Sequence, residues 1–192
     1  MGVIIITKKV LAAATFAVAA LWLLAGLLFL YYGTSFWQTW VIALGTTFYH
    51  FAMRWLVGAA YQGLLHNCVD YTHRWFAPRH FEPKLYAAVH IKRWKSRLPV
   101  YNKAWFHIAQ GCYEQVVMAM CQAELVHETI MALAFVPVLF AAYFQAFWVF
   151  LLTSVASALI DLPFVMLQRY NRPRLLRLMA KKAACKTDGI SL

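Results

Sequence analysis

The sequence has few charged residues and very few acidic ones. Asp, Glu, Lys and Arg make up 13% of its 192 residues, and only seven residues are acidic. A soluble domain carries about 25% charged residues, so this composition excludes an ordinary soluble globular domain. Hydrophobic residues account for 63% of the chain and aromatic ones for 17%. We therefore predict an all-α integral membrane protein that forms a single membrane domain over residues 1–192.

Cysteine and histidine are also scarce, and their spacing excludes the common metal and redox motifs. The four cysteines form no CxxC pair and no zinc-ribbon pattern, which favours unpaired structural thiols. Only seven histidines are present, without the H-x-x-H-H boxes of membrane oxygenases. We predict no metal site and no cofactor.

Long apolar runs are what the sequence has in abundance. About twenty apolar residues cross the hydrocarbon core of a bilayer as a helix. Four runs meet this length, and we predict transmembrane helices at 10–32, 36–60, 124–143 and 147–167. The connections at 33–35 and 145–146 are short enough for tight hairpins only.

The distribution of positive charge predicts the orientation. Two basic residues precede the first span, eight lie between Tyr61 and His107, and seven follow Leu167, whereas both short hairpins carry none. Because cytoplasmic loops carry an excess of Lys and Arg, both termini, the region 61–122 and the basic tail 168–192 are expected in the cytoplasm. The predicted location is the cell membrane, with a multi-pass topology.

The region 61–122 combines basic residues with aromatic ones and is divided by Pro78, Pro83 and Pro99. Such interleaving can indicate nucleic acid. Beside membrane spans it favours interfacial helices or a re-entrant hairpin, whose rings lie at headgroup level and whose cations meet anionic lipids. We predict no nucleic-acid partner.

A candidate catalytic group opens the third span, at "AELVHE". Glu124 and His127 are three residues apart and share one helical face, and Glu128 flanks them. A histidine oriented by a carboxylate can act as a general base toward a hydroxyl. Two other interpretations are open: a polar entry to the membrane, or half of a di-iron site, which lacks its second E-x-x-H here.

Two further polar groups stand out. Within the predicted spans, His50 and Arg54 share a face, and Asp161 lies at a matching depth, which predicts an Arg54–Asp161 ion pair. The pair can clamp two helices or bind a polar substrate head. In "HNCVDYTH", the spacing of His66, Asp70 and His73 predicts that the three side chains share one helical face. There they either bind a metal or form a polar group at the cytoplasmic surface.

Basic residues at two places are suited to binding phosphate. The segment "LQRYNRPRLLRLM" places several arginines together, and arginine forks bind phosphate bidentately. The predicted substrate- and phosphate-binding residues are Arg169, Asn171, Arg172 and Arg174, together with Lys92, Arg93, Trp94 and Lys95. A charge cluster that only fixes topology would look similar.

Three strings, "IKRWKSRLP" (91–99), "AELVHE" (123–128) and "QRYNRPRLLRL" (168–178), resemble in this order the glycosyl-4,4'-diaponeurosporenoate acyltransferase family. The resemblance covers about residues 76–180. It implies a short polytopic membrane protein that transfers a fatty acyl chain, as the type member of the family does onto the sugar of a glycosylated carotenoid; the acceptor of a relative can differ. It carries over no catalytic residue.

The leading hypothesis is thus transfer of an acyl chain, from acyl-CoA or another thioester, to a hydroxyl or amine of a lipid or glycolipid acceptor. Expected partners are that acceptor, the acyl donor and anionic lipid headgroups; the oligomeric state stays open. Four alternatives are a transacylase without thioester donor, a variant with Cys112 or Cys121 as nucleophile, a non-enzymatic lipid-binding protein and a metal-dependent membrane oxidoreductase.

Overall fold

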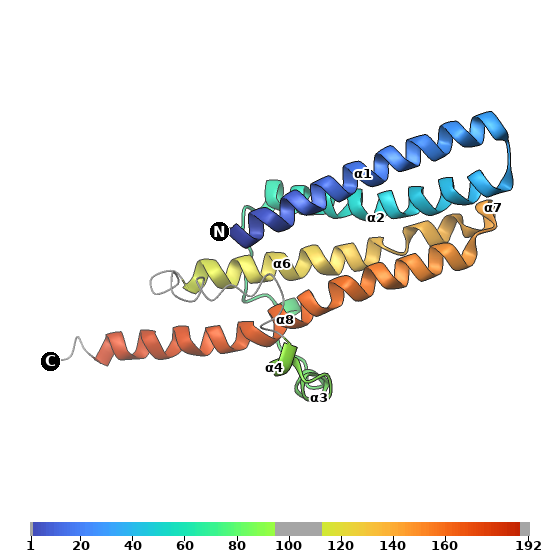
Figure 1. The fold of residues 1–192 in the computed structure, drawn as a ribbon. Coiled ribbons are helices and arrows are strands. Elements are labelled where there is room, and N and C mark those ends of the chain that lie inside the picture. Colours follow the sequence, from blue (N-terminus) through green and yellow to red (C-terminus); the bar gives the residue numbers. More distant parts are fainter. Residues whose placement is uncertain (1, 95–112, 189–192) are drawn as a thin grey trace. The chain divides into compact units, whose positions relative to one another are not determined.

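In the part of the chain that the structure describes, every secondary-structure element is a helix. A computed structural model describes residues 2–94 and 113–188, with side chains for 9–94 and 113–182. The four long helices are α1 (Gly2–Tyr32), α2 (Ser35–Leu65), α6 (Tyr113–Leu133) and α8 (Phe147–Asp188). The short ones are η1 (Arg74–Phe76), α3 (Glu82–Ala88), α4 (Ile91–Trp94), η3 (Val136–Phe140) and α7 (Ala141–Phe144) (Figure 1). The predicted all-α class is confirmed over these ranges.

The two predicted hairpins are short turns that begin with a left-handed residue. Gly33 ends α1 with φ +64°, and its N–H donates to the Phe29 carbonyl at 2.8 Å. A left-handed residue after the last helical turn is a common helix terminator, usually glycine. Gln145, with φ +52°, ends α7 in the same way. Each reversal therefore takes only two residues, 33–34 and 145–146.

Three helical segments, not four, are long and apolar enough to cross a membrane, which suggests a membrane protein. They are Lys9–Tyr32, Tyr113–Phe144 and Phe147–Lys182. The prediction of a fourth span at 36–60 is wrong by this measure, although α2 covers that segment. Polar side chains such as Thr46, Thr47, His50 and Arg54 recur along α2 and lower its mean hydropathy.

The last helix is longer than the sequence indicated. We expected a span at 147–167 followed by a tail, but α8 continues to Asp188 with Pro163 and Pro173 inside it. Proline removes one backbone donor and commonly kinks or ends a helix. Because α8 continues, the arginines after Leu167 project from a helix at defined spacing.

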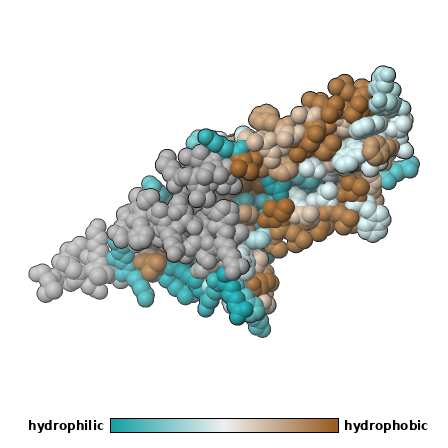
Figure 2. Space-filling model, in the orientation of Figure 1, coloured by the Kyte–Doolittle hydropathy of each residue, from teal (hydrophilic) through white to brown (hydrophobic). Residues whose placement is uncertain are grey.

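Unit 1, one of two compact units in the chain, comprises residues 1–60 and 128–162. Trp22 stacks on Phe48 with ring centroids 5.7 Å apart, and the Tyr49 hydroxyl donates to the Leu133 carbonyl at 2.9 Å. Large apolar side chains along α1, including Leu23, are exposed, and hydrophobic surface runs along its helices in Figure 2. Such a surface fits a lipid environment.

Unit 2 comprises residues 61–127 and 163–192. Its apolar core contains five buried residues: Val69, Phe76, Val117, Cys121 and Leu175. The core joins the connection after α2 to α6 and α8, so η1 is packed between elements that lie far apart in the sequence. The prediction that residues 1–192 form one membrane domain stays a prediction.

Candidate functional site

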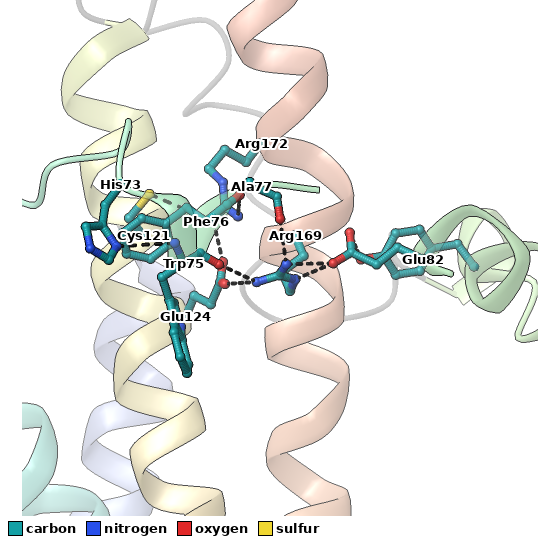
Figure 3. Close-up of polar contacts among 10 residues, drawn as sticks. His73, Trp75, Phe76, Ala77, Glu82, Cys121, Glu124, Arg169 and Arg172 are labelled. Carbon is teal, nitrogen blue, oxygen red and sulfur yellow. Dashed lines mark hydrogen bonds and ion pairs between the residues drawn. The ribbon is translucent and has the colours of Figure 1, made fainter. Parts of the chain in front are cut away.

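A buried carboxylate on α6 is the centre of the main polar cluster of unit 2. Glu124 has no exposed surface, and each of its oxygens accepts from an arginine of α8 (Figure 3). Arg169 Nη1 donates to Oε1 at 2.5 Å, and Arg172 Nη1 donates to Oε2. The two arginines are three residues apart, so both lie on the face of α8 that meets α6.

Arg169 uses its whole guanidinium within the protein. Its Nε and Nη2 contact Oε1 of Glu82 at 2.7 and 2.6 Å, and Nη2 also donates to the Ala77 carbonyl at 3.0 Å. Its Nη1 reaches the Trp75 carbonyl at 3.3 Å as well as Glu124. Guanidinium has five N–H donors, so every donor has an acceptor. Glu82 is 4% exposed and begins α3.

Arg172 performs a similar task one turn further along α8. Its Nη2 donates to the Phe76 carbonyl at 2.6 Å, and its guanidinium lies over the Phe76 ring, 5.1 Å from the centroid. Its Nη1 also approaches the sulfur of Cys121 at 3.8 Å. Together the two arginines hold the carbonyls of three consecutive residues, 75 to 77, against α6 and α8.

The cluster of Glu82, Glu124, Arg169 and Arg172 is electrically balanced, with two carboxylates and two guanidinium groups. Removal of one partner from a buried pair typically costs about 3–5 kcal/mol, because the other charge stays buried without compensation. We therefore assign this cluster a positioning role: it fixes η1 and the start of α3 on the α6–α8 pair.

A pocket of about 580 Å³ lies beside this cluster within unit 2. Its lining combines α3, α4 and α8, and its basic residues are His90, Lys92, Arg93, Arg169, Arg174 and Arg177. In the described part of the lining, Glu82 is the one carboxylate, and Arg169 neutralises it. Lys92, Arg93, Arg174 and Arg177 are exposed, so their charges are available to an anion that enters the pocket.

Aromatic side chains form one wall of this basic pocket. Tyr86 and Tyr170 make an edge-to-face contact at 5.3 Å, and the Arg174 guanidinium lies 4.0 Å from the Tyr170 centroid. Burial and the neighbouring Glu82 carboxylate raise the pKa of the Tyr86 phenol above its ordinary value. The phenol therefore stays protonated and donates to Glu82 at 3.1 Å. Ring contacts therefore hold Tyr86 and Tyr170 in place, and Arg174 adds a positive charge to this wall.

His127 lies about one helical turn beyond Glu124 on α6 and is half-buried. Its ring stacks on the Phe164 ring of α8; the two centroids are 4.8 Å apart and the angle between the ring planes is 9°. The stack fixes the ring plane and leaves the ring edge, which carries both nitrogens, for polar contacts. The predicted orientation of His127 by Glu124 stays a prediction, as do the catalytic roles of both residues and of Glu128.

The structure divides the predicted phosphate-binding residues into two groups. Lys92, Arg93 and Arg174 line the basic pocket, whereas the carboxylates and carbonyls around Arg169 and Arg172 favour a positioning role for those two. Asn171 lies on α8 between them and is half-buried. Trp94 ends α4 and donates to the Val89 carbonyl at 2.9 Å. Lys95 lies outside the described residues.

The lining and cluster residues that were not predicted from the sequence as site residues include Glu82, Tyr86, His90 and Tyr170. Glu82 was the one with a signal, because it is one of only seven acidic residues, stands in a basic stretch and precedes Pro83. A buried acid in such a stretch needs a cationic partner.

The prediction that His66, Asp70 and His73 share a helical face is wrong. α2 ends at Leu65, and His66 and Asn67 take left-handed conformations with φ +47° and +61°. Asp70 instead accepts from the Thr72 hydroxyl at 2.6 Å and from the Thr72 N–H at 2.9 Å, and these hydrogen bonds lower the pKa of its carboxyl. The ring of His73 accepts from the Trp75 N–H at 3.2 Å. Within residues 2–94 and 113–188, no three His, Cys, Asp or Glu residues gather as a metal site.

In unit 1, the predicted ion pair of Arg54 and Asp161 is present. Arg54 Nη2 lies 2.5 Å from the Asp161 carboxylate and donates to the Ser157 hydroxyl at 3.0 Å. Arg54 Nη1 also donates to the carbonyl of His50, one turn earlier, at 2.7 Å. The pair clamps α2 to α8 within unit 1.

Comparison with known protein families places a match over more than half of the chain. The family model described as glycosyl-4,4'-diaponeurosporenoate acyltransferase matches residues 72–181. All the lining residues of the basic pocket and all four members of the buried cluster fall within this range. No curated protein and no solved structure matches the chain.

Proposed function

This chain belongs to the glycosyl-4,4'-diaponeurosporenoate acyltransferase family, and from that premise we propose that it is a membrane-embedded acyltransferase. It moves a fatty acyl chain from an acyl thioester to a hydroxyl or amine of a lipid or glycolipid acceptor. The observation that carries the proposal is the basic pocket of unit 2, whose lining lies wholly within the matched segment.

The pocket suits the phosphate groups of a thioester such as acyl-CoA. Lys92, Arg93, Arg174 and Arg177 present four exposed cations around a volume of about 580 Å³, in the range of small-ligand sites. Charge-assisted hydrogen bonds from arginine to phosphate are among the strongest available to a surface pocket. The aromatic wall of Tyr86 and Tyr170 adds a flat surface for a planar ligand group.

His127 is the proposed general base. The neutral imidazole accepts the proton of the acceptor hydroxyl while the oxygen attacks the thioester carbonyl. The carbon–sulfur bond then breaks, and the imidazolium returns the proton to the departing thiolate. The stack on Phe164 supports this role because it holds the ring in one plane. Backbone or arginine N–H groups stabilise the oxyanion of the intermediate.

The test compares lipids by mass spectrometry from cells without the protein, with it, and with His127→Ala. We expect acylated lipids that need the protein, with their formation reduced about 10²–10⁴-fold by His127→Ala. His80→Ala is the matched control because His80 is exposed and does not line the pocket. An active, normally folded His127→Ala protein refutes the mechanism, and no protein-dependent acylated lipid refutes the function.

The donor pocket has its own test. Lys92→Gln should raise the KM for the acyl donor with little change in kcat, because it removes an interaction made equally in ground and transition states. Lys84→Gln on α3 is the control, since Lys84 is exposed and is not a lining residue. Equal effects of the two substitutions would place the donor phosphates elsewhere.

A further inference from the structure

α2 and α8 present matching buried faces within unit 1. The buried residues of these faces recur at helical spacing: Thr46, His50, Met53 and Val57 on α2, and Phe150, Ser154, Ser157 and Asp161 on α8. Spacings of three and four residues keep side chains on one side of a helix. Five of the eight side chains are polar, which is unusual for a face within apolar helices.

Contacts at both ends align the two faces. Thr46 and Phe150 line the same pocket, and Arg54 reaches Ser157 and Asp161 further along both helices. His50 and Ser154 each lie one turn beyond the pocket residue of their own helix, a rise of about 6 Å. They therefore occupy the layer between the pocket and the ion pair.

The polar side chains of this middle layer have no partner in the described part of the chain. His50 is 6% exposed and Ser154 is fully buried, yet both ring nitrogens and the hydroxyl lack a hydrogen bond. The ring of His50 does contact Tyr49 edge-to-face at 5.5 Å, but that contact leaves the nitrogens unsatisfied. An unsatisfied buried polar group destabilises the folded state, because it loses its hydrogen bonds to water and gains none in return. A bound ligand with a hydrogen-bonding group would satisfy both side chains at once.

The adjoining pocket has the chemistry of a hydrocarbon site. It has a volume of about 290 Å³, and its lining includes Trp22, Pro137, Phe140, Phe144 and Phe150. Two of its polar side chains are already engaged: Thr46 donates to the Ile42 carbonyl at 2.7 Å, and Tyr49 donates to the Leu133 carbonyl at 2.9 Å. The volume is at the small end of ligand pockets, which fits part of a single chain.

We propose that unit 1 binds a neutral lipid, with its hydrocarbon chain in this apolar pocket and a hydroxyl or carbonyl oxygen hydrogen-bonded to His50 and Ser154. A neutral imidazole has one donor and one acceptor, and a serine hydroxyl supplies both. A charged head does not fit, because Asp161 already neutralises Arg54 and a further buried charge would lack compensation. This binding does not depend on acyl transfer or on the basic pocket.

The probe is a long-chain alcohol that carries a diazirine on its chain, used on the full-length protein in lipid nanodiscs. After illumination, peptide mapping should find the label on segments that line the apolar pocket, within residues 41–49 and 136–150. Unlabelled hexadecanol should suppress this labelling, whereas hexadecane and palmitate should suppress it much less. Equal suppression by hexadecane, stronger suppression by palmitate, or labelling confined to other segments overturns the proposal.

Ser154→Ala tests the polar contact and Thr153→Val is its matched control. The hydroxyl of Thr153 already donates to the Val149 carbonyl at 2.7 Å, so its loss should not affect the ligand. We expect Ser154→Ala to weaken competition by hexadecanol about tenfold, and Thr153→Val to leave it unchanged. An unchanged affinity in Ser154→Ala contradicts the proposal.

Thermal unfolding without added alcohol gives an independent measurement. Because Ser154 has no hydrogen-bond partner among the described residues, Ser154→Ala should retain or raise the unfolding temperature, as should His50→Leu. A clear loss of stability in both variants would mean that these groups have partners within the protein, and would overturn the ligand-binding interpretation.

Discussion

The contacts of Glu124 in the buried cluster predict that its carboxylate stabilises the fold, whether or not it also takes part in catalysis. In Glu124→Gln, the carboxylate that compensates two buried guanidinium groups becomes neutral. Arg169 keeps Glu82, but among the described residues Arg172 keeps only the Phe76 carbonyl and the Cys121 sulfur. The uncompensated charge on Arg172, which is 2% exposed, therefore dominates the cost.

The expected loss is about 3–5 kcal/mol, the usual cost of removing one partner of a buried pair. For a chain of this size each kcal/mol lowers the unfolding temperature by about 2–4 °C, so the shift should be on the order of 10 °C. The assay is thermal unfolding in detergent, followed by circular dichroism. Glu114→Gln is the control, because Glu114 is exposed on the same helix and its substitution should cost no more than about 0.5 kcal/mol.

A double-mutant cycle separates the pairing from other effects. Arg172→Met removes the buried cation, so the combination with Glu124→Gln should cost clearly less than the two single substitutions added together. If Glu124→Gln unfolds at the temperature of the original protein and yet loses activity, the reasoning is refuted. Glu124 would then act on His127, as its three-residue spacing suggested.

Three further substitutions test other parts of the structure by the same unfolding assay. Asp161→Asn should cost about 3 kcal/mol because Arg54 loses its buried partner; an unchanged unfolding temperature would mean that the pair does not clamp α2 to α8. Gly45→Ala places a Cβ 2.8 Å from Trp22 Nε1 and should cost about 1–3 kcal/mol, with changed tryptophan fluorescence; fluorescence and stability like the original would contradict this close approach. Gly33→Ala should cost about 1–2 kcal/mol, since its φ of +64° is strained for a residue with a Cβ; no loss would show that the turn adapts.

Local rules predicted the helices, their turns and one tertiary contact. The Arg54–Asp161 pair could be predicted because both residues lie in apolar helices, where an ionisable group needs a partner at the same depth. The turn at Gly33 followed from a short polar break between two apolar runs. The second helix was also found, but its polar face removes it from the candidate membrane spans.

The partners of Glu124 could not be predicted in this way. E-x-x-H spacing places Glu124 and His127 on one face, but it cannot say which neighbouring helix that face meets. The structure brings Arg169 and Arg172 to it from 45 and 48 residues away. Glu82 lies 87 residues from Arg169, and no local pattern connects them. From the sequence, the four arginines at 169–177 were therefore equivalent. In the structure, carboxylates neutralise Arg169 and Arg172, whereas Arg174 and Arg177 line the basic pocket as exposed cations.

The same long sequence separations bear on how the protein is made. Arg169 reaches the Trp75 carbonyl across 94 residues, and Arg172 reaches the Phe76 carbonyl across 96. Ribosomes add about 5–20 residues per second, so η1 and α3 emerge several seconds before the arginines that fasten them. Until α8 emerges, the nascent chain exposes the carbonyls of 75 to 77 and the Glu82 and Glu124 carboxylates without their cations. A chain that stops short of Arg169 lacks every α8 residue that lines the basic pocket, so the pocket is complete only once the last helix has been made.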